Sequence, residues 1–511
     1  MIPTLSNELK WLKDNVITLK NICRGIERET LRINLDGQLS NIPHPFFLGS
    51  ALTNKWITTD FSESSLEFIT PVNNDINFLL NFLNHSYHFV SQNIINERMW
   101  PLSIPLLPKN ENMIPIAQYG SSKIGEKKTI YRQGLKNRYG SSMHMISGIH
   151  YNFSLSLDFW KKWKKINNHK INYISEGYFK IIRNYHRFGW IIPYLFGSSP
   201  TLCSNLIKNK KNIHYLKKNK KVDFYAPWST SLRLSNFGYK NYSHTKLNMK
   251  FNSLNEYLFN LKYAINTPFE KFEKIGLKNS IGLYNQLNTN ILQMENELYT
   301  PVRPKILLKS GESYLKKLSK KGIEYIEIRS LDINPFYPIG INKEQILFLD
   351  LLLIWCLLIH SPFLTKTELK IVYENWNRVI FEGRKPNQHI LINKNKDSVS
   401  LMTIGKTIFQ DLFKIAEILD LNNNNNNYYN VCLELIKYFD NTELTYSAQL
   451  LDKLIKYGIK NTGLELANKY YEYYKLKPLN KNINDLFLKE SKRSIKEQDI
   501  IEKINKSSFL K

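Results

Sequence analysis

The sequence lacks the features of secreted, disulfide-rich and membrane-spanning proteins. Its 511 residues include four cysteines, none in CxxC spacing, so we expect neither a disulfide framework nor a zinc site and infer a reducing compartment. The first residues, MIPTLSNELKWLKDN, contain no apolar core or small-residue cleavage site, so we expect no signal peptide. The longest apolar run, residues 346–359, is interrupted by Asp350 and is too short to cross a bilayer. We therefore expect a buried helix there and a cytoplasmic protein.

The sequence is also short of acidic residues. It has 71 Lys and Arg against 44 Asp and Glu, a formal charge of +27. Such an excess points towards a polyanion partner. However, lysine is spread along the whole chain beside abundant Asn and Ile, which share A/T-rich codons, and we find no zinc knuckle, RNP-type aromatic pair or basic arm. We attribute the charge to compositional bias and expect no nucleic-acid partner; the asparagine run at residues 422–427 predicts a loose loop.

Strand-like and helix-like segments are distributed unevenly along the chain. Hydrophobic residues make up 42% of the sequence, enough for a large core. Residues 51–61, 64–72, 147–157, 229–237 and 323–335 resemble strands, whereas 86–100, 176–196 and most segments after 342 have helical spacing. Because strands and helices do not alternate regularly, we predict an α+β fold with a mainly antiparallel sheet. The expected divisions are a sheet domain over 1–338, a helical region over 339–481 and a charged, frayed tail over 482–511.

The segment RGIERETLRI, residues 24–33, carries an unusual density of charge. On a strand, Glu27 and Glu29 share one face, whereas Arg28 faces the other side. Such a carboxylate pair either binds cations or repels itself. The alternative is a solvated edge strand, because exposure is the usual fate of Glu and Arg.

The same pattern recurs in other predicted strands. His150 and Asn152 share a face in SGIHYNFSL, Glu327 and Arg329 share one in IEYIEIRSL, and Asp60 and Glu67 flank a small-residue stretch. Side by side, these strands would form a polar floor whose carboxylates need cations, and oxygen-rich ligands select Mg²⁺ or Mn²⁺ over zinc. A single histidine such as His150 is more often structural than a ligand. The recurrence over several strands favours a metal-dependent nucleotide site.

Known nucleotide-binding and nucleophile motifs are missing. GSSKIGEKK, from Gly120, places its lysine one position too late for a P-loop. We therefore interpret it as a mobile polar loop. No GxGxxG follows a strand, and no GxSxG elbow is present. If ATP binds, we expect it to bind on the sheet through metals.

Long motifs resemble one known family. RGIERETLR, WITTDFSESSLEFITP, KNRYGSSMHMISGIHYNFSL, RNYHRFGWIIPYLFGSSP, LQMENELYTPVRPK and GIEYIEIRSLDINPF closely resemble bacterial glutamate–cysteine ligase of the proteobacterial type. The resemblance runs from residue 1 to about 477 and is densest before 338. It implies a curved, mainly antiparallel sheet similar to the glutamine synthetase catalytic domain, with flanking helices and a helical C-terminal part. It also implies a monomer that uses ATP, Mg²⁺ (or Mn²⁺), L-glutamate and L-cysteine in the first step of glutathione biosynthesis.

The resemblance also implies roles for individual residues. Metal ligands would be Glu27, Glu29, Asp60, Glu67, His150 and Glu327. Cations on the transferring phosphate and the substrate carboxylate would be Arg132, Arg233 and Arg329. The substrate pocket would contain Phe61, Tyr131, Leu135, Asn152, Tyr239 and Tyr299, together with His144, where the family pattern has glutamine. Because histidine titrates near neutral pH, we expect His144 to affect the selectivity for cysteine.

Two alternatives remain open at this point. The resemblance implies that ATP phosphorylates the γ-carboxylate of glutamate to γ-glutamyl phosphate, which the amine of cysteine then attacks. One alternative keeps this chemistry but uses a different amine acceptor, and His144 and the pocket aromatics would decide between the two. The other is a non-catalytic basic protein that binds RNA, supported by charge alone. The six residues of metal-ligating type argue against that second alternative.

Overall fold

The structure, a computed structural model, describes residues 5–167, 172–207, 213–238, 247, 249–309, 311–393, 395 and 397–504. Its main feature is an antiparallel sheet with strand order β2-β3-β1-β5-β10-β9, to which β4 adds by pairing with β1. These strands are β1 (Cys23–Asn34), β2 (Ile57–Thr59), β3 (Ser65–Ile69), β4 (Glu97–Met99), β5 (Ile149–Ser154), β9 (Val302–Lys305) and β10 (Tyr325–Leu331). The predicted α+β class is confirmed.

The charged strand β1 lies inside the sheet, between β3 and β5. Its Arg28, Thr30 and Arg32 are fully buried. Arg28 lies 4.8 Å from the centre of the Tyr87 ring, and Arg32 pairs with Glu97 at 2.6 Å. The alternative of a solvated edge strand is therefore wrong, because the face opposite the glutamates is compensated by buried partners rather than by water.

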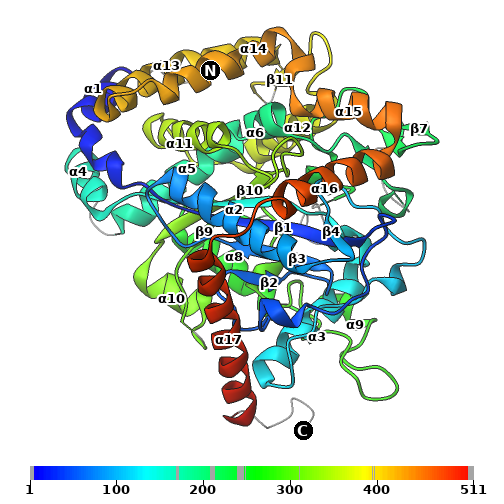
Figure 1. The fold of residues 1–511 in the computed structure, drawn as a ribbon. Coiled ribbons are helices and arrows are strands. Elements are labelled where there is room, and N and C mark those ends of the chain that lie inside the picture. Colours follow the sequence, from blue (N-terminus) through cyan, green and yellow to red (C-terminus); the bar gives the residue numbers. More distant parts are fainter. Residues whose placement is uncertain are drawn as a thin grey trace.

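Helices cover the face of the sheet on which Arg28 lies. α2 (Ile76–Asn93) packs on β1 and β3, α5 (Tyr173–Phe188) on β9, and α6 (Ile191–Phe196) on β10. α11 (Lys343–Leu358) packs behind them, begins at a capping box formed by Asn342 and Gln345, and is buried from Gln345 to its end. The prediction of a buried helix over 346–359 is confirmed. Figure 1 shows α13 (Leu401–Asn423) and α14 (Asn427–Asp440) as an outer layer above α11.

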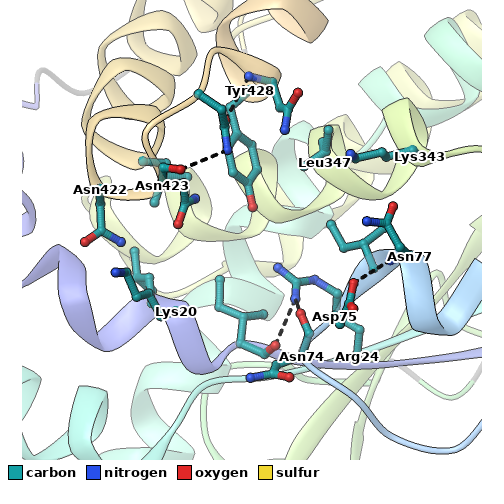
Figure 2. A pocket seen from close by; sticks show the side chains of 16 residues that line it. Lys20, Arg24, Asn74, Asp75, Asn77, Lys343, Leu347, Asn422, Asn423 and Tyr428 are labelled. Carbon is teal, nitrogen blue, oxygen red and sulfur yellow. Dashed lines mark hydrogen bonds between the residues drawn. The ribbon is translucent and has the colours of Figure 1, made fainter.

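A buried ion pair joins the sheet to these outer helices. Arg24 of β1 donates to both carboxylate oxygens of Asp350 on α11 at 2.6–3.1 Å. Asp350 also accepts from the hydroxyls of Tyr151 on β5 and Tyr428 on α14. A small polar cavity of about 210 Å³ lies beside Arg24, bordered by the end of α13 and the start of α14 (Figure 2). The asparagine run thus joins two ordered helices, with Asn424 in the left-handed conformation at the end of α13.

The remaining elements surround this framework. The helices are α1 (Ser6–Asn15), α3 (Lys123–Tyr139), α4 (Leu157–Asn167), α8 (Leu254–Asn266), α9 (Glu270–Glu273), α10 (Tyr314–Lys321), α12 (Lys366–Glu382), α15 (Tyr446–Tyr457), α16 (Ile459–Lys475) and α17 (Lys481–Ile504). The short strands β6 (Thr201–Leu202), β7 (Lys217–Asn219) and β8 (Asp223–Tyr225) form one small sheet, and β11 (His389–Leu391) and β12 (Ser398–Ser400) form another. None of the helices within the described ranges has the length and apolarity that a membrane crossing needs.

Three segments differ from the sequence-based expectation. Residues 229–237 do not form a strand but contain a 3₁₀ turn, Leu232–Leu234. The helix expected over 86–100 ends at Asn93, and Glu97–Met99, near the end of the expected range, form β4. The expected polar loop after Gly120 begins α3 instead, where the Ser122 hydroxyl accepts a hydrogen bond from the Gly125 amide.

The C-terminal segment also differs, because α17 occupies most of the expected frayed tail. The Ser494 hydroxyl accepts from the amide of Ser50, and Glu490 accepts from the amide of Lys55. Further along, Glu502 accepts from the amide of Ser121. Figure 1 shows α17, in red, extending away from α16 along one side of the sheet region. The helix is stabilised by tertiary contacts rather than by its polar sequence.

Candidate active site

A cavity of about 880 Å³ lies on the face of the sheet opposite the buried arginines. Its floor is formed by side chains of β1, β3, β5 and β10, and α3 forms one wall. Of the residues expected to take part in the site, it is lined by Glu27, Glu29, Asp60, Phe61, Glu67, Tyr131, Arg132, Leu135, His144, His150, Tyr299, Glu327 and Arg329. One concave surface thus brings together all six expected metal ligands.

His150 lies at the centre of the floor. Its Nδ1 is 3.2 Å from Glu27 Oε2 and 3.7 Å from Glu327 Oε1, and its Nε2 is 3.6 Å from Glu29 Oε1. Register produces this cluster, because His150 is directly opposite Glu27 on the neighbouring strand. Glu27, His150 and Glu327 each offer one ligand atom within 4.8 Å of the others. This donor set of two carboxylates and one imidazole fits a divalent cation.

A second carboxylate group lies beside this cluster. Glu29 and Glu67 face each other directly across β1 and β3. Burial raises the pKa of Glu67 well above its ordinary value, and the negative charges of Glu27, Asp60 and Glu29 raise it further. Burial also raises the pKa of Glu29. This half of the floor therefore carries more negative charge than its surroundings compensate, which is the electrostatic condition for cation binding.

The opposite half is compensated by basic side chains. Glu327 is 3.4 Å from Lys305 Nζ and 3.2 Å from Arg329 Nη1. Burial opposes ionisation of Glu327, but Lys305 and Arg329 together lower its pKa well below the ordinary value. Lys305 and Arg303 were missed in the sequence. Arg303 and Lys305 are two residues apart in VRPK, so their side chains share one face of β9, and the two residues pair with Glu327 and Tyr325 on the neighbouring strand. This alternation is the sequence signal that identifies them.

Aromatic side chains form one end of the cavity. The rings of Phe61 and His144 stack with centroids 4.7 Å apart, and the Tyr299 hydroxyl is 3.3 Å from His144 Nδ1. Burial lowers the pKa of His144 to about 3, so the imidazole is neutral at physiological pH rather than titrating there as expected. Tyr299 also borders, with Arg329, an apolar cavity of about 760 Å³.

Two expected site residues contact the site without lining the cavity, and one lies outside the described residues. Asn152 donates to Glu27 Oε1 at 2.9 Å and orients that carboxylate. Arg233 is fully buried, pairs with Asp332 at 3.6 Å and donates to the main-chain carbonyl of Arg329 at 3.1 Å. A side chain at Gly148 would meet the Arg233 guanidinium at 1.9 Å, so only glycine fits there. Tyr239 lies outside the described residues.

Two further residues belong to this part of the site. Lys128 lies one turn before Arg132 on α3 and lines the cavity, in the segment for which the sequence predicts a loop. Burial, with the charge of Arg132, lowers the pKa of Lys128 to about 8. Tyr119 lies beneath both cations, 4.8 Å from Lys128 Nζ and 4.5 Å from Arg132 Cζ. No sequence pattern marked this tyrosine.

An antiparallel sheet with a carboxylate floor, a central histidine and basic walls has the chemistry of an enzyme that binds anionic substrates together with divalent cations. Comparisons with known proteins specify the class. The family profile for glutamate-cysteine ligase matches residues 9–379. Glutamate–cysteine ligase of Buchnera aphidicola from Acyrthosiphon pisum is 55% identical over 98% of this chain and 95% of its own length. That of Erwinia tasmaniensis is 49% identical over 98% and 97%.

Solved structures agree with these sequence relatives. The crystal structure of glutamate–cysteine ligase from Francisella tularensis, in complex with AMP, superimposes with a TM-score of 0.90 at 32% identity and covers 96% of each chain. The chain therefore belongs to the glutamate–cysteine ligase family. It is an enzyme, a ligase of the family that serves glutathione biosynthesis.

Proposed function

We propose that this enzyme joins the γ-carboxylate of L-glutamate to the amine of L-cysteine at the expense of ATP. The products are γ-glutamylcysteine, ADP and phosphate. The observation that carries the proposal is the cluster of Glu27, His150 and Glu327 beside the cations Arg132 and Arg329 in one cavity. The AMP bound by the Francisella relative supports an adenine nucleotide as the co-substrate.

We propose Mg²⁺ as the resident cation, with Mn²⁺ as a substitute. Glu27, His150 and Glu327 would hold one ion, and Glu29, Asp60 and Glu67 provide the remaining carboxylates of the floor. When bound, such an ion supplies charge neutralisation for the phosphates. The environment of Glu67 supports this fit. Burial and the neighbouring carboxylates disfavour its ionised form, and a bound cation would compensate that negative charge.

The reaction takes two group transfers. In the first, a γ-carboxylate oxygen of glutamate attacks the γ-phosphorus of ATP, the bond to the bridging oxygen breaks, and ADP leaves with the electron pair. In the second, the cysteine amine attacks the acyl carbon, phosphate leaves, and the amine proton passes to that phosphate. Arg132 and Arg329 border the cavity and would stabilise the charge that develops on the transferred group. Arg233 would act through its hydrogen bond to the Arg329 carbonyl.

The aromatic end of the cavity supports a small, weakly polar amine as acceptor. Phe61, Tyr131, Leu135 and Tyr299 line it with His144, and a thiol suits an aromatic, partly apolar surface. Because His144 is neutral, it offers a hydrogen bond and no charge. A different small amine as acceptor is the second candidate function, and the histidine at this position is the feature that favours it.

ADP release by purified protein tests both candidates. The assay contains Mg²⁺-ATP and glutamate, with cysteine, serine, 2-aminobutyrate or no amine, and mass spectrometry identifies the product. Release that depends on cysteine, with γ-glutamylcysteine formed, supports the first candidate. Release that is stimulated more by another amine selects the second, and H144Q should then shift the preference towards cysteine. No turnover with any amine would overturn both.

A further inference from the structure

Lys128 shares one face of α3 with Arg132. The two residues are four apart on the helix, so their side chains lie one above the other, and both line the cavity. Arg132 is anchored, because its Nε donates to the Asp60 carbonyl and its Nη1 to the Lys128 carbonyl. Two cations therefore face the carboxylate floor from one rigid element.

Tyr119 contacts both cations. Its ring is within 5 Å of each, 4.8 Å from Lys128 Nζ and 4.5 Å from Arg132 Cζ, distances typical of cation–π contacts. Its hydroxyl is 2.8 Å from the Thr59 carbonyl and 3.0 Å from that of Asp60. Tyr119 is only 2% exposed, so this contact is part of the packed structure. One tyrosine thus connects the two cations to the backbone that carries Asp60.

The Lys128 ammonium makes no hydrogen bond or ion pair with the part of the chain that the structure describes. An ammonium in a cavity wall loses hydration, which costs free energy unless an anion replaces the water. The nearby Glu67 attracts Lys128 but forms no ion pair with it within the described residues. Arg132 uses Nε and Nη1 for hydrogen bonds to main-chain carbonyls, and its remaining N–H groups can bind a ligand. Lys128 and Arg132 therefore have the geometry of a site in which two cationic donors bind one anion.

We propose that Lys128 is a phosphoryl-binding residue that acts with Arg132 on the γ-phosphate of ATP during its transfer, and that Tyr119 is the residue that positions both. This inference rests on the proposed function. It adds no bond to the transfer described above: the ammonium and guanidinium donate hydrogen bonds to the non-bridging oxygens, which carry the charge of the transition state.

A purely charge-balancing role for Lys128 makes different predictions. If Lys128 only offsets the carboxylates, removing its charge should tighten Mn²⁺ binding and should affect ATP and ADP analogues equally. If Lys128 contacts the γ-phosphate, removal should weaken binding of the triphosphate selectively, because ADP lacks that group. The comparison of tri- and diphosphate therefore separates the two roles.

The experiment compares K128M and K128R with the control K136M in the full-length protein. Lys136 lies on the same helix but does not line the cavity. Calorimetry measures Kd for the non-hydrolysable analogue AMP-PNP and for ADP with Mg²⁺, and steady-state assays give kcat/KM for ATP. We expect K128M to weaken AMP-PNP binding at least tenfold and ADP binding less than twofold, since a charged hydrogen bond is lost. K128R should recover most of the loss, and K136M should resemble the wild type.

Tyr119 is tested by a double-mutant cycle. If Tyr119 acts by positioning the cations, the double variant Y119L/K128M should lose little more AMP-PNP affinity than the worse single variant. Full additivity would overturn the positioning role. Equal weakening of AMP-PNP and ADP in K128M, or a change below twofold in both, would overturn the role of Lys128. Wild-type protein that releases no ADP with glutamate and any amine would instead refute the proposed function.

Discussion

Replacing Asp350 by asparagine would test whether one buried ion pair joins the sheet to the outer helices. Asp350 is fully buried and accepts hydrogen bonds from Arg24, Tyr151 and Tyr428. The three donors lie on β1, β5 and α14, and Asp350 itself lies on α11. Burial alone would lower the pKa of Arg24, but the Asp350 carboxylate reverses the effect and raises it above the ordinary value. Arg24 is therefore charged in the folded protein.

The expected cost follows from leaving Arg24 without a counter-charge. Asparagine keeps the size of the side chain but removes the charge, and breaking a buried pair in this way costs about 3–5 kcal/mol. The double variant R24M/D350L removes both charges. It should cost only about 1–3 kcal/mol, mainly because Tyr151 and Tyr428 lose an acceptor at about 1 kcal/mol each.

Urea denaturation measures these differences. Tryptophan fluorescence and limited proteolysis should give coincident midpoints, which is the condition for converting them into free energies. The single variant D350N should be less stable than the double variant. A loss below about 1 kcal/mol in D350N would refute the reasoning. So would a loss in R24M/D350L that equals the sum of the losses in the single variants R24M and D350L.

Three further predictions concern the cavity. Glu327→Gln should lower the kcat of ADP release at least about a hundredfold, since one carboxylate of the predicted metal set is lost; full activity would contradict the assignment. Tyr299→Ala should raise the KM for cysteine about tenfold through the loss of ring contacts and of its hydrogen bond to His144; a change in the glutamate KM alone would show that the acceptor pocket lies elsewhere. Glu67→Gln should raise the thermal midpoint of metal-free protein at pH 8. The pKa of Glu67 is raised above 4.5 in the folded state, so the wild type binds a proton on folding and loses stability as the pH rises through the window above 4.5. The stability advantage of the variant should therefore shrink towards pH 5. A stability advantage that does not depend on pH would contradict the assignment.

The polar floor was predictable because it depends on a periodicity of two. Glu27 and Glu29, His150 and Asn152, and Glu327 and Arg329 each share a face whatever the rest of the fold does. The order in which the strands lie side by side is not contained in that periodicity. It depends on the tertiary register that places His150 opposite Glu27. The resemblance to known ligases, rather than the pattern, supplied that information.

Errors of prediction occur where tertiary contacts override local preference. The glycine and lysines after residue 120 favour a loop, yet Ser122 caps a helix there. Gly125 is required because a side chain would lie 2.2 Å from the Tyr119 carbonyl, and neither contact is visible in the sequence. The same is true of α17, whose few buried residues include Phe487 and Ser494. Phe487 packs on Phe89 of α2, and Ser494 accepts a hydrogen bond from Ser50, which is 444 residues earlier.

The position of α17 in the chain has a consequence for synthesis. The helix holds the turns around Ser50 and Ser121 through Ser494 and Glu502, and these turns lead into β2 and α3 at the edge of the cavity. A ribosome makes these turns 381 to 444 residues before the residues of the helix that hold them. During translation, the strands that carry the glutamates are therefore made well before the contacts that hold the rim above them, and the rim of the substrate cavity is completed later than its floor.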